Sequence, residues 1–399
     1  MGLFNRKPPS TGPDWFARLG VAGEAVNLGL GVLAVVRAPN TLLWMASIGS
    51  TEWGHILALL GLAPLLTNWR ASRAGRLSAG LGAAAALLAL TPLLRALPVA
   101  QSLPSQLHQA FGESLPRSGP EAPALDQPLS ATKLLLGVRS PKVVVSTHTY
   151  ASRDGQDLLL DIYQPSERNG PLPGVLVIHG GAWRGGDRTQ LPALNRYLAA
   201  RGYLVAALSY RLAPAHLFPA AHDDVHAALD YLKAKAAALE LDAGRLVLLG
   251  RSAGAHLALL AAYSLNDPSI RGVVSFYGPA DLHYGYANPS NPAVIDTRSV
   301  QEQFLGGNPE QVPEVYDAAS PIQFVGPNTP PTLLIHGGRD ELVAHRQSER
   351  LAERLAQQGR PHLLLSLPWA THGFDVNFSG PASQLSTYAI ERFLASVCP

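Results

Sequence analysis

Ser252 is the serine whose neighbours best suit nucleophilic chemistry, because it lies at the centre of Gly250-Arg251-Ser252-Ala253-Gly254. An apolar run, 245–249, precedes this pentapeptide and a run of small residues, 253–262, follows it. The pattern predicts a strand, a sharp turn and a helix. A G-x-S-x-G sequence in that context is typical of a nucleophile elbow, in which glycines allow a turn so tight that the serine Oγ stands above the sheet.

A nucleophilic serine needs a base and an acid, and the chain offers both further along. Asp340 closes the segment 336–340, directly after the apolar run 332–335, and His372 lies in a loop after the run 363–367. The order Ser252, Asp340, His372 is the order of the triad in α/β sheets that carry a nucleophile elbow. We expect His372 to take the proton of Ser252 and Asp340 to orient the imidazole and stabilise its charged form.

The segment His179-Gly180-Gly181-Ala182-Trp183 follows the apolar run 176–178 and is typical of an oxyanion loop. Glycines suit such a loop because backbone N–H groups must approach the developing oxyanion closely. We predict that the donors are the N–H groups of Gly180, Gly181 and Ala253.

Other residues compete for these roles. Ser252 could be an inert serine in a tight turn, but the agreement in order and loop placement favours the triad. We expect His179 to brace the oxyanion loop and His256 to pack behind the elbow. His336 is the remaining rival of His372 for the role of base. Glu341 and Asp375 are the rivals of Asp340 for the role of acid.

Residues from about Val143 to the C-terminus resemble the α/β-hydrolase superfamily, and within it the hormone-sensitive-lipase-like and feruloyl-esterase-like (BD-FAE-like) carboxylesterases. The elbow and oxyanion loop carry this likeness, as do the segments 210–214, 218–221 and 340–343. The elbow carries Arg251 where many relatives carry Asp or Gly. The resemblance implies cleavage of small carboxylic esters through an acyl-enzyme.

Two further readings of the same fold stay open. The oxyanion loop is also similar to those of bacterial kynurenine formamidases and isoprenylcysteine methylesterases, which keeps an amidase, formamidase or peptidase as an alternative. A non-catalytic membrane receptor or scaffold is the other alternative. Trp183 and Tyr210 are candidates for lining the substrate pocket, although either could instead be a packing residue. We expect no metal and no organic cofactor, because the triad carries out its own proton transfer.

Short apolar runs alternate with helical patterns over residues 141–399, which predicts an α/β fold with an open, mostly parallel, doubly wound sheet. The first two runs lie close enough in sequence to pair antiparallel. An irregular insert, 278–331, is expected to roof the pocket as a lid. The predicted strands are 142–145, 158–163, 174–178, 203–209, 245–249, 272–276, 332–335 and 363–367.

The composition excludes several classes of protein. The 399 residues carry a net charge of +2, which gives no reason to expect a nucleic-acid partner. Cys398 is the one cysteine of the chain, so an intramolecular disulfide and a cysteine metal site are excluded. Acyl and alcohol specificity, the physiological substrate and the oligomeric state are left open.

Residues 1–97 are predicted to form an anchor of two or three transmembrane helices in the lipid bilayer. Residues 77–94 form an uncharged apolar stretch between Arg76 and Arg95, and residues 53–69 form a second one with a tryptophan at each end. A third candidate, 25–50, could be one irregular span, two half-buried helices or an interfacial segment. A buried pair of helices in a soluble domain is the alternative. We expect a retained anchor rather than a cleaved signal peptide.

The basic residues predict how the anchor is oriented. The segment 68–76 contains three arginines and no acid, so the positive-inside rule places it in the cytoplasm. Three spans would also place the N-terminal basic residues there. We therefore expect a multi-pass protein of the cell membrane with an extracytoplasmic catalytic domain.

Residues 98–140 are predicted to be a proline-rich linker. Prolines at positions 98, 104, 116, 120, 123 and 128 are expected to break any helix. The catalytic domain would then comprise residues 141–399.

Overall fold

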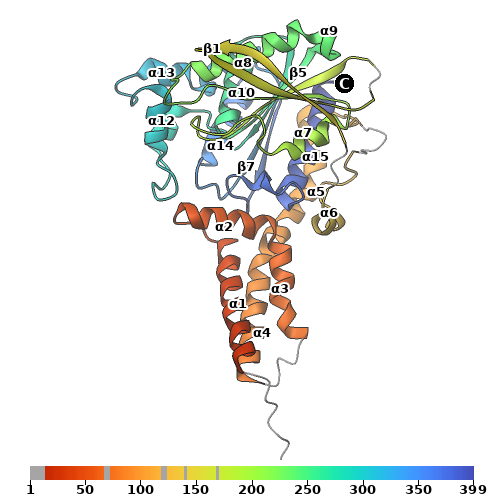
Figure 1. Cartoon of the computed structure of the whole chain (residues 1–399), viewed down its shortest axis with the longest axis vertical. Helices are drawn as coiled ribbons and strands as arrows, with labels where there is room; N and C mark the ends of the chain where they lie inside the picture. The colour runs from red at the N-terminus through yellow and green to blue at the C-terminus, as the bar shows by residue number, and fades with distance from the viewer. Residues whose placement is uncertain (1–13, 67–71, 118–123, 139–141, 168–169) are drawn as a thin grey trace, which may run out of the picture.

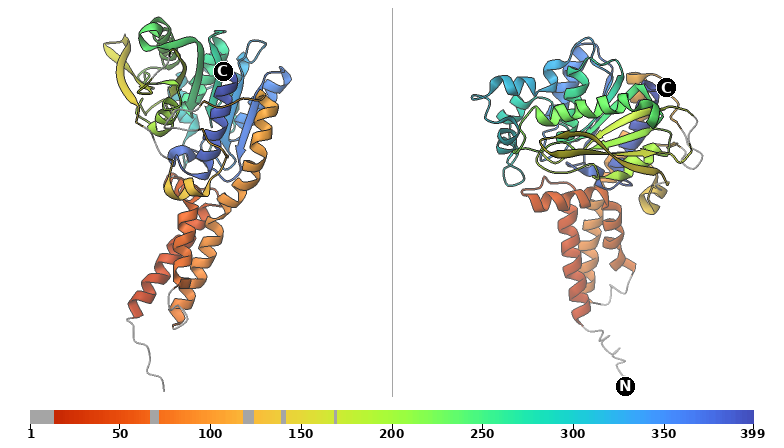
Figure 2. Two further views of the ribbon diagram at one scale, coloured as in Figure 1. Left: turned by 90° about the vertical axis from the view of Figure 1, so that its right-hand side faces the viewer. Right: turned by 45° about the horizontal axis from the view of Figure 1, so that its top comes forward.

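The computed structural model describes residues 14–66, 72–117, 124–138, 142–167 and 170–399, and places an α/β domain at one end of a slender bundle of helices (Figure 1). The bundle consists of α1 (Asp14–Leu33), α3 (Gly54–Leu66) and α4 (Arg73–Ala89). Between the bundle and the domain, α2 (Thr41–Glu52) lies across the base of the domain, and α5 (Thr91–Phe111) continues from α4 along its side (Figure 2).

The sheet has eight strands in the order β1-β2-β4-β3-β5-β6-β7-β8. β2 pairs antiparallel with both β1 and β4, and the other neighbours are parallel. The predicted fold class, a mostly parallel sheet with an antiparallel opening pair, is therefore confirmed. The bounds are β1 (Val144–Arg153), β2 (Gln156–Gln164), β3 (Leu172–Ile178), β4 (Leu204–Leu208), β5 (Leu241–Arg251), β6 (Ile270–Phe276), β7 (Thr332–Gly337) and β8 (His362–Leu367).

Helices cover both faces of the sheet because the central strands are apolar on both sides. Along β3, Leu176 and Ile178 face one core, whereas Val175 and Val177 face the other. The first core is covered by α8 (Ala220–Ala234), α10 (Ala253–Ser264) and α14 (Arg346–Gln357), and α9 (Ala236–Leu239) follows α8. The second core is covered by α5, α7 (Pro192–Ala199) and α15 (Pro381–Val397).

The insert between β6 and β7 is more regular than we predicted. It contains the short helices α11 (Leu282–Ala287), α12 (Thr297–Leu305) and α13 (Pro313–Ala318) and the 3₁₀ turn η2 (Pro321–Phe324). A second 3₁₀ turn, η3 (Phe374–Val376), follows β8. Phe304 and Tyr316 of the insert are buried and fix it to the domain.

The prediction that prolines break any helix in the linker is wrong. α5 continues through Pro98 and Pro104, and its Leu103 and Leu107 are buried in the second core. Burial of this apolar face offsets the roughly 3 kcal/mol that a proline inside a helix costs. The rest of the segment holds the short helix α6 (Ala131–Leu136), and residues 118–123 and 139–141 lie outside the described part of the chain.

The predicted anchor corresponds to α1 to α4 and the first turns of α5. The third candidate span divides into two helices, since α1 ends at Leu33 and α2 begins at Thr41. Within the described residues, one helical stretch, 73–111, is long and apolar enough to cross a membrane. Residues 67–71, which include part of the arginine-rich segment, lie outside the described residues.

Candidate active site

Ser252 forms the turn between β5 and α10, as the pentapeptide predicts. Its backbone angles, φ 53° and ψ −119°, are unusual for a residue with a side chain and place it at a sharp bend. A Cβ on Gly250 would lie 2.2 Å from the carbonyl oxygen of Gly254, and a Cβ on Gly254 would lie 2.2 Å from that of Ile178. The two glycines are therefore required by the close approach of backbone segments.

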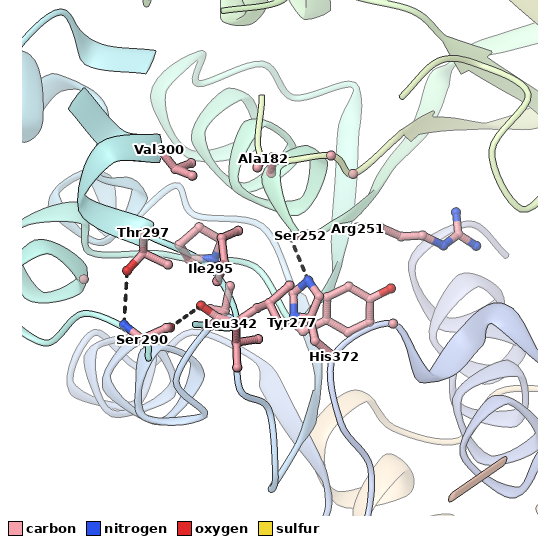
Figure 3. A pocket seen from close by; sticks show the side chains of 18 of the residues that line it. Ala182, Arg251, Ser252, Tyr277, Ser290, Ile295, Thr297, Val300, Leu342 and His372 are labelled. Carbon is pink, nitrogen blue, oxygen red and sulfur yellow. Dashed lines mark hydrogen bonds between the residues drawn. The ribbon is translucent and has the colours of Figure 1, made fainter. Parts of the chain in front are cut away.

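The structure brings Ser252, His372 and Asp340 together in one hydrogen-bonded chain. His372 Nε2 lies 2.9 Å from the Oγ of Ser252, and His372 Nδ1 lies 2.7 Å from an Oδ of Asp340. Figure 3 shows the imidazole ring of His372 pointing at Ser252, with a dashed line for the hydrogen bond between them. In this geometry the imidazole can accept the hydroxyl proton while the carboxylate holds its Nδ1–H.

The Asp340 carboxylate is buried and fully supplied with donors. Its Oδ1 accepts hydrogen bonds of 2.8 Å from the backbone N–H groups of Leu342 and Val343. Its other oxygen also lies 3.2 Å from His336 Nε2. Burial raises the pKa of Asp340, but the charge of His372 and the hydrogen bonds from His336 and His372 lower it more, so the net pKa is well below its usual value.

The oxyanion loop differs from our prediction in one donor. The N–H of Gly180 donates a 2.9 Å hydrogen bond to Oε1 of Gln190, so it is occupied within the protein. The N–H groups of Gly181, Ala182 and Ala253 have no acceptor among the described residues. Gly181 and Ala182 both have positive φ, 130° and 54°, which turns the loop toward Ser252. Ala182 thus replaces Gly180 in the set of candidate donors.

A cavity of about 520 Å³ opens beside Ser252 and is lined mostly by apolar side chains. Gly181, Ala182, Ala253 and His372 all line it, so the candidate donors and the base face the same space. The insert supplies one wall with Ile295, Thr297 and Val300, which Figure 3 shows on the side of the cavity away from Arg251. The insert therefore lines the pocket, as we expected of a lid.

Comparisons with known proteins agree with this geometry. Residues 160–355 match the BD-FAE family. The chain is 34% identical over 256 residues to Esterase LipC of Mycobacterium tuberculosis, a match that covers 60% of this chain and 62% of the relative. A solved bacterial heroin esterase superposes with a TM-score of 0.57 at 25% identity, covering 65% of this chain and 86% of that one.

The chain has the α/β-hydrolase fold. It is also 29% identical to the ethyl acetate hydrolase of Pseudomonas putida, over 67% of this chain and 87% of that enzyme. The chain spans about three fifths of the length of LipC and of the related mycobacterial protein LipM, a probable carboxylic ester hydrolase.

The rival histidines His256 and His179 have other partners. His256 Nδ1 accepts from the indole N–H of Trp183 at 3.2 Å, and its Nε2 lies 2.6 Å from the carbonyl oxygen of Ala319. Burial lowers the pKa of His256 to about 4, so it is a neutral packing residue. His179 stacks on Tyr210 behind the oxyanion loop, with ring centres 4.2 Å apart, and braces it as predicted.

The rival carboxylate of Asp375 is also engaged elsewhere. Asp375 pairs with the guanidinium of Arg251 and accepts a hydrogen bond from the hydroxyl of Tyr277. The Tyr277 ring in turn lies 4.3 Å from that of His372, measured between centres. Arg251 of the elbow thus anchors a network that supports one side of the base.

The two residues predicted to line the pocket have different positions in the structure. Trp183 lines the cavity and stacks on Phe304, with ring centres 4.4 Å apart. Tyr210 is absent from the described residues that line the cavity, and the prediction for it is wrong. Its hydroxyl donates to the carbonyl oxygen of His179 at 3.1 Å, so it supports the oxyanion loop from behind.

Sequence reasoning missed the contribution of the N-terminal region to the site. Thr41, Trp44 and Ile48, all on α2, line the cavity. The rings of Trp44 and His372 lie 6.5 Å apart between centres. The spacing of these three residues, i, i+3 and i+7, is the one signal in the sequence that α2 presents a face to a neighbour.

Proposed function

We propose that this protein is a serine carboxylesterase that its N-terminal helices anchor in a membrane. The chain of hydrogen bonds from Ser252 through His372 to Asp340 is the observation that carries the catalytic part. The named ester hydrolases among the relatives support the choice of an ester as the bond that is cleaved.

In the proposed mechanism, the Oγ of Ser252 attacks the ester carbonyl carbon while His372 Nε2 takes the hydroxyl proton. The carbonyl oxygen becomes an oxyanion that accepts hydrogen bonds from Gly181, Ala182 and Ala253. The C–O bond to the alcohol then breaks and the alcohol leaves with the proton from His372. Water attacks the acyl-serine by the same sequence of proton transfers, which releases the carboxylic acid and restores Ser252.

The distribution of apolar side chains supports the membrane anchor. Large apolar side chains point outward from all three bundle helices, including Val26 on α1, Leu59 and Leu60 on α3, and Leu87 on α4. Leu87 is 70% exposed. Exposed apolar surface of this extent is costly in water and favourable in a bilayer.

The interior of the bundle has the opposite character, because small and polar residues fill it. Ala58, Ala86 and Ala89 are buried between the helices, and a Cβ on Gly82 would lie 2.1 Å from the carbonyl oxygen of Gly61. Close packing through small residues is characteristic of helices that associate within a bilayer. The buried Asn27 donates to Glu24 and to the carbonyl oxygen of Leu57, both at 3.2 Å, and so links α1 to α3.

The direction of the helices supports the proposed orientation. α1, α3 and α4 cross the length of the bundle three times, so the N-terminal end of α1 and the catalytic domain lie at opposite ends (Figure 1). Arg18, Arg73 and Arg76 lie near the end remote from the domain, where the positive-inside rule expects the cytoplasm. We propose that the catalytic domain is extracytoplasmic.

The proposed activity is tested by hydrolysis of p-nitrophenyl butyrate by the full chain in detergent micelles, with the matching p-nitroanilide for comparison. We expect ester turnover that exceeds amide turnover, and a loss of about a million-fold in kcat for Ser252→Ala. Equal rates for the wild type and Ser252→Ala would overturn the proposal, and faster turnover of the anilide would favour an amidase.

A further inference from the structure

The wall of the active-site cavity that α2 forms belongs to a helix with two different faces. Thr41, Trp44 and Ile48 face the cavity, whereas Leu42 and Met45 point away from the protein and are 70% and 52% exposed. One helix therefore contacts both the space beside Ser252 and the surroundings of the bundle.

The polarity of α2 is inverted relative to a helix at a water-exposed surface. Ser47, Ser50, Thr51 and Glu52 are buried against the protein, while the apolar Leu42 and Met45 are exposed. The Glu52 carboxylate accepts a 3.2 Å hydrogen bond from the N–H of Ala382, and the Glu52 carbonyl oxygen accepts one of 2.9 Å from the side chain of Asn377. The buried polar groups thus fix α2 to the domain and leave its apolar face turned outward.

The position of α2 places this apolar face at the membrane boundary. It lies across the base of the domain, where α1 ends and α3 begins (Figure 1). With the bundle in a bilayer, a helix at this height lies in the interfacial region, where outward apolar side chains insert among the lipids.

Hydrogen bonds join the α2 region to the insert where both line the cavity. The hydroxyl of Thr41 donates to the carbonyl oxygen of Val294 at 2.7 Å, and the side chain of Asn291 donates to that of Pro39 at 3.0 Å. Val294 and Ile295 then continue the apolar lining from this junction into the cavity. Apolar side chains of α2 and of the insert therefore line the same cavity beside Ser252.

We infer that the substrate is a long-chain ester dissolved in the bilayer, which reaches Ser252 from the membrane along α2 rather than from the aqueous phase. This inference rests on the proposed esterase activity and membrane anchor. The apolar tail of such a lipid stays in an apolar environment throughout, first among lipid chains and then against Trp44, Ile48 and Ile295. A short ester is soluble in water and gains little from this route.

The test uses the full chain reconstituted in phosphatidylcholine nanodiscs and two probes with the same fluorescent leaving group. 4-Methylumbelliferyl oleate is dissolved in the bilayer, and 4-methylumbelliferyl butyrate is supplied in the aqueous phase. The variant Leu42→Glu/Met45→Glu places two charges on the outward face of α2. Its control, Val144→Glu/Val145→Glu, places two charges on exposed positions of β1, whose partners Gln164 and Tyr163 lie at the end of the sheet away from Ser252.

We expect the α2 variant to lose about tenfold or more in kcat/KM for the oleate and to stay within about twofold for the butyrate. The control variant should stay within about twofold for both. Unchanged oleate turnover by the α2 variant would overturn the inference. An equal loss on both probes, in protein with an unchanged unfolding temperature, would also overturn it.

A failure of the proposed esterase activity has a different signature, because the wild type would then hydrolyse neither probe faster than Ser252→Ala does. If the charged variant does not reconstitute, Leu42→Gln/Met45→Gln replaces it. Because this variant adds no charge, we expect a smaller loss in kcat/KM, again for the oleate and not for the butyrate. If the loss is not selective for the oleate, the inference is overturned.

Discussion

The backbone N–H of Ala38 donates a 3.1 Å hydrogen bond to the buried carboxylate of Glu341, the residue that follows Asp340. The other carboxylate oxygen of Glu341 accepts a hydrogen bond from the hydroxyl of Thr371, which precedes His372. Next to it, the guanidinium of Arg339 donates to the carbonyl oxygen of Leu33 at 3.1 Å. The turn between α1 and α2 is therefore bound to both loops that carry the acid and the base.

This link predicts that Glu341→Ala lowers both stability and activity. The substitution leaves the N–H of Ala38 buried without an acceptor, at a cost of about 1–3 kcal/mol, and frees the loops of Asp340 and His372. We expect a fall of about tenfold in kcat/KM for a short ester. Glu341→Gln keeps an acceptor for Ala38 and should retain most of the activity. If Glu341→Ala behaves like Glu341→Gln, the link has no role in holding the triad.

The hydrogen bond from Gly180 to Gln190 predicts that Gln190 is a positioning residue, which holds the oxyanion loop in place for catalysis. Gln190→Leu removes the acceptor that holds the oxyanion loop, so we expect kcat for p-nitrophenyl butyrate to fall about tenfold to a hundredfold, with a smaller change in KM. Gln190→Glu keeps an acceptor at this place and serves as the control. A loss in KM alone for Gln190→Leu would instead assign Gln190 to substrate binding.

The buried His256 predicts that stability decreases in acid. Because burial holds its pKa at about 4 in the folded protein, against an ordinary value of 6.5, the unfolded chain binds the proton first. Its contribution to stability is therefore complete above about pH 6.5 and is lost progressively as the pH falls toward 4, by roughly 3 kcal/mol in all.

This pH dependence is measured as the unfolding temperature of the full chain between pH 7 and pH 4. His256→Gln can still accept from Trp183 and donate to Ala319, and it should flatten the decline. Part of the decline in unfolding temperature should remain in this variant, because burial also lowers the pKa of His222, to about 3. An unchanged decline in His256→Gln would show that other groups are responsible.

The close contact between α3 and α4 predicts opposite effects of alanine at two glycines of α4. Gly82→Ala brings a methyl group against the backbone of Gly61 and should lower the unfolding temperature in detergent, at a cost of about 1–3 kcal/mol. Gly80 has no atom within 4 Å of the position of an added Cβ, so Gly80→Ala should be neutral or slightly stabilising. Equal effects of the two substitutions would contradict this packing of the bundle.

The parts of the site that local rules determine were predictable from the sequence. The glycines around Ser252, the apolar strand before it and the chain order of Asp340 and His372 each follow from short segments. The strands were predictable for the same reason, since continuous apolar runs mark the buried parallel strands.

The parts that depend on distant contacts were not predictable. The side chain of Gln190 accepts a hydrogen bond from the N–H of Gly180, and nothing near Gly180 in the sequence indicates this contact. Tyr210 was a candidate for lining the pocket, whereas its hydroxyl lies behind the oxyanion loop. α5 continues through Pro98 because its apolar face packs on α15, a helix almost 300 residues away in the sequence.

The central claim is that Ser252 is the nucleophile, and labelling with a fluorophosphonate tests it most directly. The full chain is treated with the reagent, digested, and the modified peptide is identified by mass spectrometry, with Ser252→Ala and Asp340→Asn treated in parallel. We predict a single modified site at Ser252 in the wild type, no modification in Ser252→Ala and much slower labelling of Asp340→Asn, because the imidazole loses the group that orients it. A folded wild type that is not labelled, or a label on another serine that persists in Ser252→Ala, would contradict the account.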